Sequence, residues 1–330
     1  MLVLSTTFRH LINKTIKSNE MSKLLVVGTV AFDDIQTPFG HAEKIVGGAA
    51  TYISWAASNF VNNVGIVSVI GDDFPQDELD ALTERGVSME GLQVKKGEKS
   101  FFWAGRYHSD MNGRDTLATE LNVLADFQPV VPESFKDADY LMLGNLSPQV
   151  QMSVIEQLPV RPKLVVLDTM NFWMDIALEE LKAVLPKIDV LTINDEEARQ
   201  LSGEYSLRKA ARVILTMGPK YLVIKKGEHG ALLFDKENIF FCPALPLEEV
   251  FDPTGAGDSF AGGFIGYMAK TNDISFNTMK RAIVYGSAAA SYCVEKFGIN
   301  RVKEVDSRDI HDRVSEFVRL MSVDAPISKL

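Results

Sequence analysis

Short apolar runs recur along the chain and constrain its fold more than any other feature. Each run ends in Gly, Asn or Asp or close to one of them. Each run contains several β-branched residues or leucines, and runs of this kind are typical of parallel strands buried on both faces of a sheet. The runs are LLVVGTVAFDDI (24–35), VGIVSVIGDD (64–73), ADYLMLGN (138–145), KLVVLDTMN (163–171), IDVLTIND (188–195) and KYLVIKKG (220–227).

Helical patterns separate these runs. The helical segments are TYISWAASNF (51–60), FPQDELDALTERG (74–86), LEELKAVLP (178–186) and DEEARQLSG (195–203). Strands that alternate with helices predict an α/β fold with a doubly wound, mostly parallel sheet and helices on both of its faces. Ligands bind such sheets beyond the carboxyl ends of the strands, which is where the Gly, Asn and Asp residues fall.

Two stretches interrupt this alternation. Residues 35–46 are too short for a crossover helix and contain a proline and a glycine. Residues 98–124 resemble a hairpin, because the Asn112-Gly113 pair favours a type I′ turn between two strand-like arms. We therefore expect these two stretches to form a small β lid. The α/β core would then comprise residues 24–34, 47–97 and 125–330.

Aromatic residues are concentrated in the second lid stretch, where they are Phe101, Phe102, Trp103 and Tyr107. Such side chains would pack on the core, cover a ligand or contact a second subunit. A homodimer through the lid is therefore one expectation. Stacking of Phe101, Trp103 or Tyr107 on a nucleobase is another.

The charge balance limits the class of partner. Lys plus Arg number 34 and Asp plus Glu number 44, and the net charge of −10 argues against a nucleic acid or an anionic membrane. No run approaches the ~18 apolar residues of a membrane helix. Residues 1–22 lack the apolar centre of a secretory signal, so we expect a disordered extension and a cytoplasmic protein. Cys242 and Cys293 would then be reduced thiols.

The stretch DPTGAGDSFAGGFIGYMA (252–269) surrounds the charged Asp258 with glycines at the start of a helical pattern. Small residues let backbone N–H groups converge at a helix N-terminus, where they bind an anion. A carboxylate beside that anion is suited to take a proton from a hydroxyl that attacks a phosphoryl group. The alternative is that Asp258 only caps the helix. The stretch is neither a Walker loop nor a G-x-G-x-x-G motif.

The segment D-P-T-G-A-G-D-S-F-A-G-G-F (252–264) closely resembles the C-terminal signature of the ribokinase-like, or PfkB-type, carbohydrate and nucleoside kinases. Other landmarks of that family occur in the expected order. They are Gly47-Gly48 before a helix, Asn194-Asp195-Glu196-Glu197 and Gly227-Glu228-His229-Gly230. The resemblance spans roughly residues 24 to 310 and implies a β lid over the site for the sugar.

The resemblance implies a kinase that uses ATP as phosphoryl donor. Asp258 would be the general base that deprotonates the acceptor hydroxyl. Gly255, Ala256 and Gly257 would supply the N–H groups of an anion hole for the transferred phosphoryl group.

The same resemblance implies Mg²⁺, held near the phosphates by Asn194 and Glu197. Because Mg²⁺ keeps most of its hydration shell, these residues would act through water. A capped first helical turn with acidic residues is the alternative for this pair. The nucleotide would also lie beside Gly227, Gly230, Thr254 and Lys225, with Lys226 or a solvated strand end as the alternative to Lys225.

On the acceptor side, the resemblance implies that Asp33 binds substrate hydroxyls, with its neighbour Asp34 as the alternative. Gly47 and Gly48 would let the backbone approach the substrate closely and would act as the hinge of the lid. In some relatives the positions of Asp252 and Thr254 contribute to a site for a monovalent cation, so K⁺ is a further expectation.

The sequence departs from the family pattern at two places. Tyr52 is the expected substrate contact where sugar-specific relatives often carry Asn, which argues against a ribokinase or a fructokinase. The segment Asp168–Trp173 lacks the usual nearby Arg, which argues against a phosphorylated sugar as acceptor.

We therefore expect an ATP-dependent phosphotransferase that phosphorylates a primary hydroxyl of a sugar or nucleoside. Two alternatives stay open. One is a vitamin or pyrimidine-type kinase of the same fold, and the other is a non-catalytic sensor that binds a nucleotide or a sugar.

Overall fold

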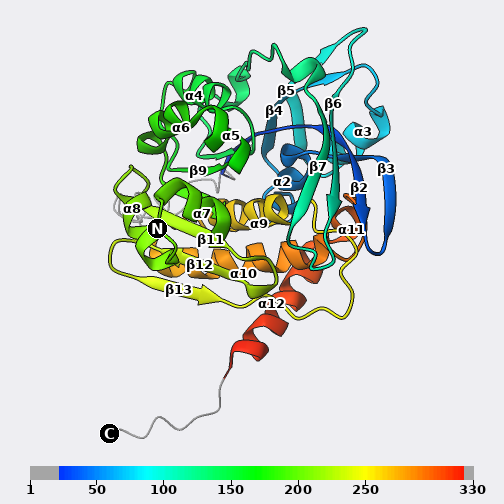
Figure 1. The fold of residues 1–330 in the computed structure, drawn as a ribbon. Coiled ribbons are helices and arrows are strands. Elements are labelled where there is room, and N and C mark those ends of the chain that lie inside the picture. The colour runs from blue at the N-terminus through cyan, green and yellow to red at the C-terminus, as the bar shows by residue number, and fades with distance from the viewer. Residues whose placement is uncertain (1–21, 323–330) are drawn as a thin grey trace, which may run out of the picture.

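A nine-stranded sheet forms the centre of the molecule (Figure 1), in the order β13-β12-β11-β10-β9-β8-β1-β4-β5. The computed structural model describes residues 22–322, so the expected extension over residues 1–22 lies outside this range except for Ser22. The strands are β1 (Leu24–Val27), β4 (Val64–Gly71), β5 (Val87–Lys95), β8 (Tyr140–Leu143), β9 (Leu164–Asp168), β10 (Val190–Asn194), β11 (Tyr221–Lys225), β12 (Ala231–Phe234) and β13 (Ile239–Cys242). Every pair from β11 to β5 is parallel, and β12 and β13 are antiparallel. The prediction of a mostly parallel sheet is confirmed.

Each of the six apolar runs contributes a strand to this sheet. The first run divides after Val27, and its second half becomes a strand of a different sheet. Gly28 lies at the division, and a Cβ there would be 2.8 Å from the backbone nitrogen of Ala50. The sequence did not predict β5, β12 and β13, which lie at the two sides of the sheet and carry exposed or half-buried residues along much of β5 and β13.

Helices cover both faces of the sheet (Figure 1), as predicted. They are α2 (Ala49–Ala57), α3 (Gln76–Glu84), α4 (Pro148–Glu156), α5 (Asn171–Ile176), α6 (Leu178–Val184), α7 (Asp195–Ser202), α8 (Leu207–Leu215), α9 (Ala256–Thr271), α10 (Phe276–Cys293), α11 (Asn300–Glu304) and α12 (Ser307–Met321). Leu24 and Val26 of β1 join an apolar core with α2, α9 and α10, and Leu25 and Val27 join a second core with α4, α6 and α8. None of the helices within residues 22–322 is long and apolar enough to cross a lipid bilayer.

Small residues bring α9 unusually close to its neighbouring helices. A Cβ on Gly262 would overlap the carbonyl oxygen of Ile53 in α2. On the other side, a Cβ on Gly263 would be 2.9 Å from the Cβ of Ala289 in α10. Because backbone atoms form the opposing surface at Gly262, α9 has one position against α2. This contact fixes the place of the N-terminus of α9, which carries Asp258.

A separate four-stranded sheet has the order β3-β2-β6-β7 (Figure 1), and we call it the lid because it contains the two stretches expected to form one. Its strands are β2 (Ala31–Thr37), β3 (Gly40–Gly47), β6 (Phe101–Tyr107) and β7 (Arg114–Glu120). The predicted boundary at residue 35 is wrong, because β2 begins at Ala31. Asp33 is therefore a lid residue and not part of the core.

The loop between β6 and β7 is not the predicted two-residue type I′ turn. Its residue with positive φ is Met111 (58°), and the N–H of His108 donates to the carbonyl of Gly113 at 2.9 Å. The carboxylate of Asp110 accepts from the N–H groups of Asn112 and Gly113, both at 3.1 Å. The side chain of Asp110 thus organises a longer loop, which the Asn-Gly pair alone did not reveal.

We expect Gly262→Ala to lower the free energy of unfolding by about 1–3 kcal/mol, since the new methyl group overpacks the interface with α2. The helix propensity of alanine would offset at most about 1 kcal/mol of that loss. Thermal unfolding followed by circular dichroism measures the change. Lys270→Ala, at an exposed position of the same helix, should stay within about 0.5 kcal/mol of the wild type. A Gly262→Ala variant as stable as the wild type would contradict the close packing of α9 on α2.

Candidate active site

The carboxyl ends of three parallel strands bring polar side chains to one edge of the central sheet. Asp168 ends β9, Asn194 ends β10 and Lys225 ends β11. The ammonium group of Lys225 donates to the carboxylate of Asp168 at 2.7 Å, and both side chains are largely shielded from solvent. Lys225 rather than Lys226 therefore points into the site.

The N-terminus of α9 lies beside this pair. Gly255 is the N-cap residue with φ of 75°, and a Cβ there would overlap the ring of Tyr52. Glycine meets both demands, since it tolerates positive φ and leaves room for the ring. Asp258 lies in the first turn of α9, and Gly255 takes the N-cap position that the alternative gave to Asp258.

The anion hole expected at residues 255–257 has unequal donors. The N–H of Ala256 donates to the carbonyl of Pro253 at 3.2 Å and is used within the turn. The N–H groups in the first turn of a helix have no partner within the helix, so Gly257 keeps a donor for an anion. Its α-carbon faces Lys225, because a Cβ on Gly257 would be 3.1 Å from the ammonium nitrogen. A backbone donor and a positive charge therefore lie next to each other.

Asp258 is half-buried next to these donors. Burial raises the pKa of its carboxyl to about 7, and the charge of Asp168 acts in the same direction. The positive charges of Lys225 and Arg114 act in the opposite direction. A carboxyl with a pKa near 7 is suited to general base catalysis at neutral pH.

Asn194 and Glu197 form a reciprocal pair at the start of α7. The side-chain oxygen of Asn194 accepts from the N–H of Glu197 at 2.8 Å, and the carboxylate of Glu197 accepts from the N–H of Asn194 at 2.8 Å. This capping box is the alternative that the sequence left open for the pair. Burial raises the pKa of Glu197 to about 7, although Lys225 opposes the shift.

These two residues fit Mg²⁺ in one way only. Each has an oxygen engaged by a backbone N–H, and residues 22–322 contain no group of three or more His, Cys, Asp or Glu side chains arranged to hold a metal ion. Mg²⁺ commonly binds through one or two carboxylates, phosphates and its own water. The buried carboxylate of Glu197 suits that arrangement, whereas a cage of protein ligands is absent from this part of the chain.

Asp252 is fully buried and ties two loops together. Its carboxylate accepts from the N–H of Thr254 and from the N–H of Gly298, both at 2.8 Å. The hydroxyl of Thr254 lies 3.1 Å from the hydroxyl of Tyr107 in the lid. The loop before α9 is therefore held from the core and contacted by the lid.

Asp33 lies on β2 with its carboxylate against Gly47 at the end of β3, where a Cβ would overlap it. Burial raises the pKa of Asp33 to about 8, and the charges of Asp252 and Asp258 act in the same direction. The neighbouring Asp34 points to the opposite face of the lid, where it binds His41 at 2.8 Å. Of the two aspartates, Asp33 is the one that faces the site.

Two other predicted residues lie close to Asp33. Gly48 is the N-cap residue of α2 and packs against the carbonyl of Thr29. Tyr52 is only 1% exposed and lies behind Gly255. Within residues 22–322 its hydroxyl has no hydrogen-bond partner. In this structure Tyr52 supports the loop before α9 and does not face the open cleft.

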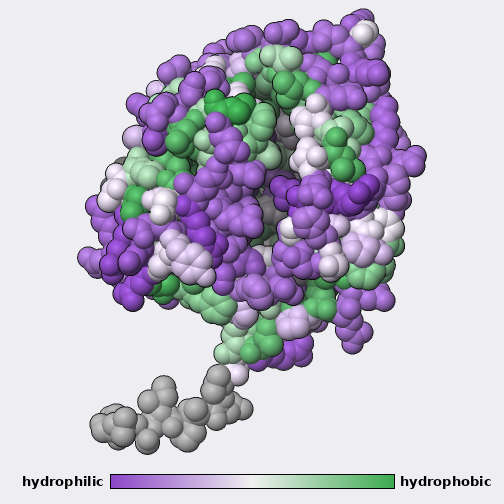
Figure 2. Space-filling view, viewed as in Figure 1, coloured by the Kyte–Doolittle hydropathy of each residue, from purple (hydrophilic) through white to green (hydrophobic). Residues whose placement is uncertain are grey.

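The turn Gly227–Gly230 follows β11 and contacts the lid. The side chain of Asn112, in the loop between β6 and β7, packs against Gly227 and donates to the carboxylate of Glu228 at 3.5 Å. Figure 2 shows the surface hollowed between the lid strands and the large layer of helices, with hydrophilic residues along the lower part of the rims and green to white residues above them. The lid thus reaches across the cleft to the expected nucleotide side.

Sequence reasoning missed Arg114, the first residue of β7. Its register partner across the hairpin is Tyr107, and its guanidinium carbon lies 5.9 Å from the centre of the Trp103 ring. The register of the hairpin would have indicated that Arg114 shares a face with Tyr107. Because the turn type was predicted wrongly, this register could not be derived from the sequence.

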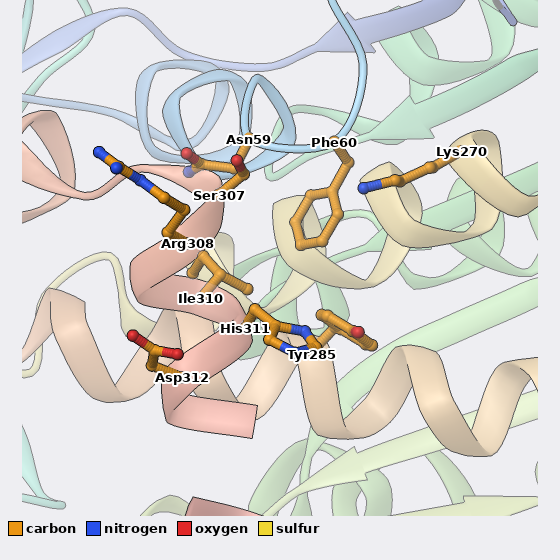
Figure 3. A pocket seen from close by; sticks show the side chains of 9 residues that line it. All are labelled: Asn59, Phe60, Lys270, Tyr285, Ser307, Arg308, Ile310, His311 and Asp312. Carbon is orange, nitrogen blue, oxygen red and sulfur yellow. The ribbon is translucent and has the colours of Figure 1, made fainter. Parts of the chain in front are cut away.

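A second hollow, with a cavity volume of about 420 Å³, lies among α9, α10, α12 and the end of α2 (Figure 3). It includes Lys270, which follows Asp258 by 12 residues along α9, or about 18 Å at 1.5 Å per residue. This hollow is therefore separate from the cleft that contains Asp258.

Known proteins resemble this chain over most of its length. The model of the pfkB family of carbohydrate kinases matches residues 21–305. The chain is 32% identical over 251 residues to the cytidine kinase of Thermococcus kodakarensis, which covers 74% of this chain and 88% of that protein.

Two solved structures share the fold. The nucleoside kinase of Methanocaldococcus jannaschii, an archaeal member of the ribokinase family, has a TM-score of 0.72 at 19% identity and covers 90% of this chain and 99% of that one. A ribokinase II from E. coli in complex with ATP and Mg²⁺ has a TM-score of 0.74 at 20% identity and covers 89% and 99%.

We expect Asp33→Asn to stabilise the ligand-free protein at alkaline pH. The pKa of Asp33 is about 8 in the folded state and near 3.8 in the unfolded state, so its contribution to stability is lost as the pH rises toward 8. The gain in melting temperature over the wild type should therefore be larger at pH 9 than at pH 5. Asp126→Asn, at an exposed position without hydrogen bonds in the described part of the chain, is the control, and its effect should be small at both pH values. An equal effect of Asp33→Asn at both pH values would show that the carboxyl is not buried as described.

Proposed function

The chain belongs to the pfkB family of carbohydrate kinases and is an ATP-dependent sugar or nucleoside kinase, and within this class we propose that it is a nucleoside kinase. The acceptor would be the primary hydroxyl of a nucleoside, with cytidine as the first candidate because of the similarity to a cytidine kinase. One observation carries the choice of a nucleoside over a plain sugar, namely the position of Trp103 on the lid.

Trp103 presents a flat apolar surface beside the expected ribose site. It is the register partner of Asp33 on the neighbouring parallel strand, and partners in register point to the same face of a sheet. A Cβ on Gly105 would overlap the Trp103 ring, so the ring lies along the strand over this glycine. Asp33 would accept hydrogen bonds from ribose hydroxyls while Trp103 stacks on the base.

In the proposed reaction the acceptor oxygen attacks the γ-phosphorus of ATP. The new bond joins that oxygen to phosphorus, and the bond between the γ-phosphorus and the β–γ bridging oxygen breaks. The proton of the acceptor hydroxyl passes to the carboxylate of Asp258, and ADP leaves with the electron pair of the broken bond. Asp258 has a suitable pKa and position for this transfer.

Charge stabilisation would come from the start of α9 and from β11. The N–H groups of Gly255 and Gly257 and the positive end of the helix dipole would bind the phosphoryl oxygens. Lys225, oriented by Asp168, would add a positive charge on the same side. Preorganised donors of this kind cost no rearrangement during the reaction.

Two cations belong to the proposal. Glu197, with Asn194, would hold hydrated Mg²⁺ beside the nucleotide, where the ion neutralises phosphate charge. A monovalent cation such as K⁺ would lie near Asp252. Burial raises the pKa of this carboxyl.

We expect Asp258→Asn to lower kcat by a factor on the order of 10² to 10⁴ while nucleotide affinity changes little, because the variant keeps the shape but loses the base. For the wild type, kcat/KM should fall as the pH drops through about 7, where Asp258 becomes protonated. Steady-state kinetics and ADP titration calorimetry measure both effects. Asp126→Asn, an exposed carboxylate without hydrogen bonds in the described part of the chain, is the control. Near-normal turnover of Asp258→Asn would exclude Asp258 as the base.

An ADP-release assay across acceptors tests the proposed substrate class. The panel contains cytidine, uridine, adenosine, inosine, ribose, fructose and a planar heteroaromatic alcohol, each with and without Mg²⁺. Turnover with at least one nucleoside, dependent on Mg²⁺ and well above that with free sugars, is expected. Turnover with sugars alone, or with the heteroaromatic alcohol alone, would contradict the nucleoside assignment. ATP binding without release for any acceptor would favour a sensor.

A further inference from the structure

The lid carries an arginine on the same face as its substrate-facing residues. Arg114 is the register partner of Tyr107, and the hydroxyl of Tyr107 lies 3.1 Å from that of Thr254, four residues before Asp258. Because register partners share a face of the sheet, Arg114 is also directed to the cleft. One end of the lid hairpin is thus placed next to the loop that precedes α9.

The loop between β6 and β7 places Arg114 relative to the turn that follows β11. Asn112, two residues earlier in the chain, contacts Gly227 and Glu228 in the turn after β11. Arg114 therefore lies between the start of α9 and the expected nucleotide turn. In agreement with this position, its positive charge lowers the pKa values of both Asp258 and Glu197, although burial raises them overall.

The carboxylates of the cleft are only partly neutralised, so a further cation would stabilise a bound phosphate group. Asp168, Glu197 and Asp258 crowd the edge of the sheet, and Lys225 is already paired with Asp168 at 2.7 Å. A nucleotide triphosphate adds further negative charge at this place. Arg114 is exposed and, within residues 22–322, forms neither an ion pair nor a hydrogen bond. Its guanidinium is free to bind phosphate oxygens with two parallel N–H groups.

We propose that Arg114 is a catalytic residue on the lid. Its guanidinium binds the transferred phosphoryl group on the side opposite to Gly257. The inference rests on the proposed function, since it concerns the same transfer. The bonds that form and break are those given above, and Arg114 neutralises the charge that is spread over the equatorial phosphoryl oxygens. Asp258 remains the proton acceptor.

This role couples acceptor binding to charge stabilisation. Asp33, Trp103 and Arg114 belong to one small sheet, so a lid that closes on the acceptor also brings the guanidinium to the phosphoryl group. Without an acceptor the cation is not held in place, and transfer of the phosphoryl group to water is not promoted. The same sheet would thus select the acceptor and complete the catalytic site.

The test compares Arg114→Gln and Arg114→Lys with Arg106→Gln. Arg106 lies on the same hairpin, but its guanidinium is on the outer face, where it donates to Gln36 at 2.9 Å. We expect Arg114→Gln to lower kcat by a factor on the order of 10² or more, with smaller changes in both KM values, as for loss of one charge-stabilising donor. Arg114→Lys should recover part of kcat, and Arg106→Gln should match the wild type.

A second measurement does not depend on turnover. Binding of ADP with aluminium fluoride and the acceptor mimics the transferred phosphoryl group, and Arg114→Gln should weaken it by a factor on the order of 10² while ADP alone binds as in the wild type. Equal binding of this complex by Arg114→Gln and Arg106→Gln would overturn the proposal. So would an effect confined to the acceptor KM, which would assign Arg114 to acceptor binding.

Failure of this inference is distinguishable from failure of the proposed function. The acceptor that the wild type uses best serves in every variant, whether it is a nucleoside or a sugar. If that acceptor is a sugar, the nucleoside assignment fails while the comparison of Arg114 with Arg106 stands unchanged. If the wild type uses nucleosides and Arg114→Gln keeps wild-type kcat, only the role of Arg114 is lost.

Discussion

The close approach of α9 to α2 is the contact on which the site depends. Gly262 allows the backbone of α9 to lie against the carbonyl of Ile53, and Gly255 allows the start of the helix to lie on the ring of Tyr52. A larger residue at either position would displace the first turn, which carries Asp258. Since a catalytic group loses efficiency when it is displaced by about 1 Å, this packing would serve function as well as stability if Asp258 is the base that we propose. The same glycines that read as a phosphate-binding motif in the sequence are thus also packing residues.

The carboxylates of the cleft oppose the stability that this packing provides. Burial raises the pKa values of Asp33, Glu197 and Asp258, which means that their charged forms are unfavourable in the ligand-free protein. Lys225 compensates in part. Burial is the largest single effect on its pKa and lowers it, but the negative charges of Asp168, Glu197 and Asp258 and the hydrogen bond to Asp168 together raise it. Cations that enter with the nucleotide would relieve the remaining repulsion. Ligand binding should therefore stabilise the folded state beyond the contacts that the ligand itself makes.

The sequence was sufficient for the parts of the fold that depend on local pattern. The six buried strands could be predicted because continuous apolar runs leave few alternatives, and the structure brings the polar ends of three of them to one edge of the sheet. Side-chain register across the lid could not be predicted, because it depends on the loop that Asp110 organises and not on the Asn112-Gly113 pair. Arg114 was missed for this reason. The capping box of Asn194 and Glu197 could be predicted only as one of two alternatives, because the same residue types favour a helix start and a magnesium site.

The lid explains why the core motifs alone do not identify the acceptor. In the proposed function, the strand ends and the start of α9 supply groups that any phosphoryl transfer to an alcohol requires, whichever alcohol accepts. Selection of the acceptor would then come from the second sheet, where Asp33 and Trp103 are register partners. Because Tyr107 contacts Thr254 and Asn112 contacts Gly227, that sheet is held both at the loop before α9 and at the turn after β11. In the proposed function, a change of acceptor specificity therefore requires substitutions in the lid more than in the core. The core groups serve the transfer step, which is the same for every acceptor.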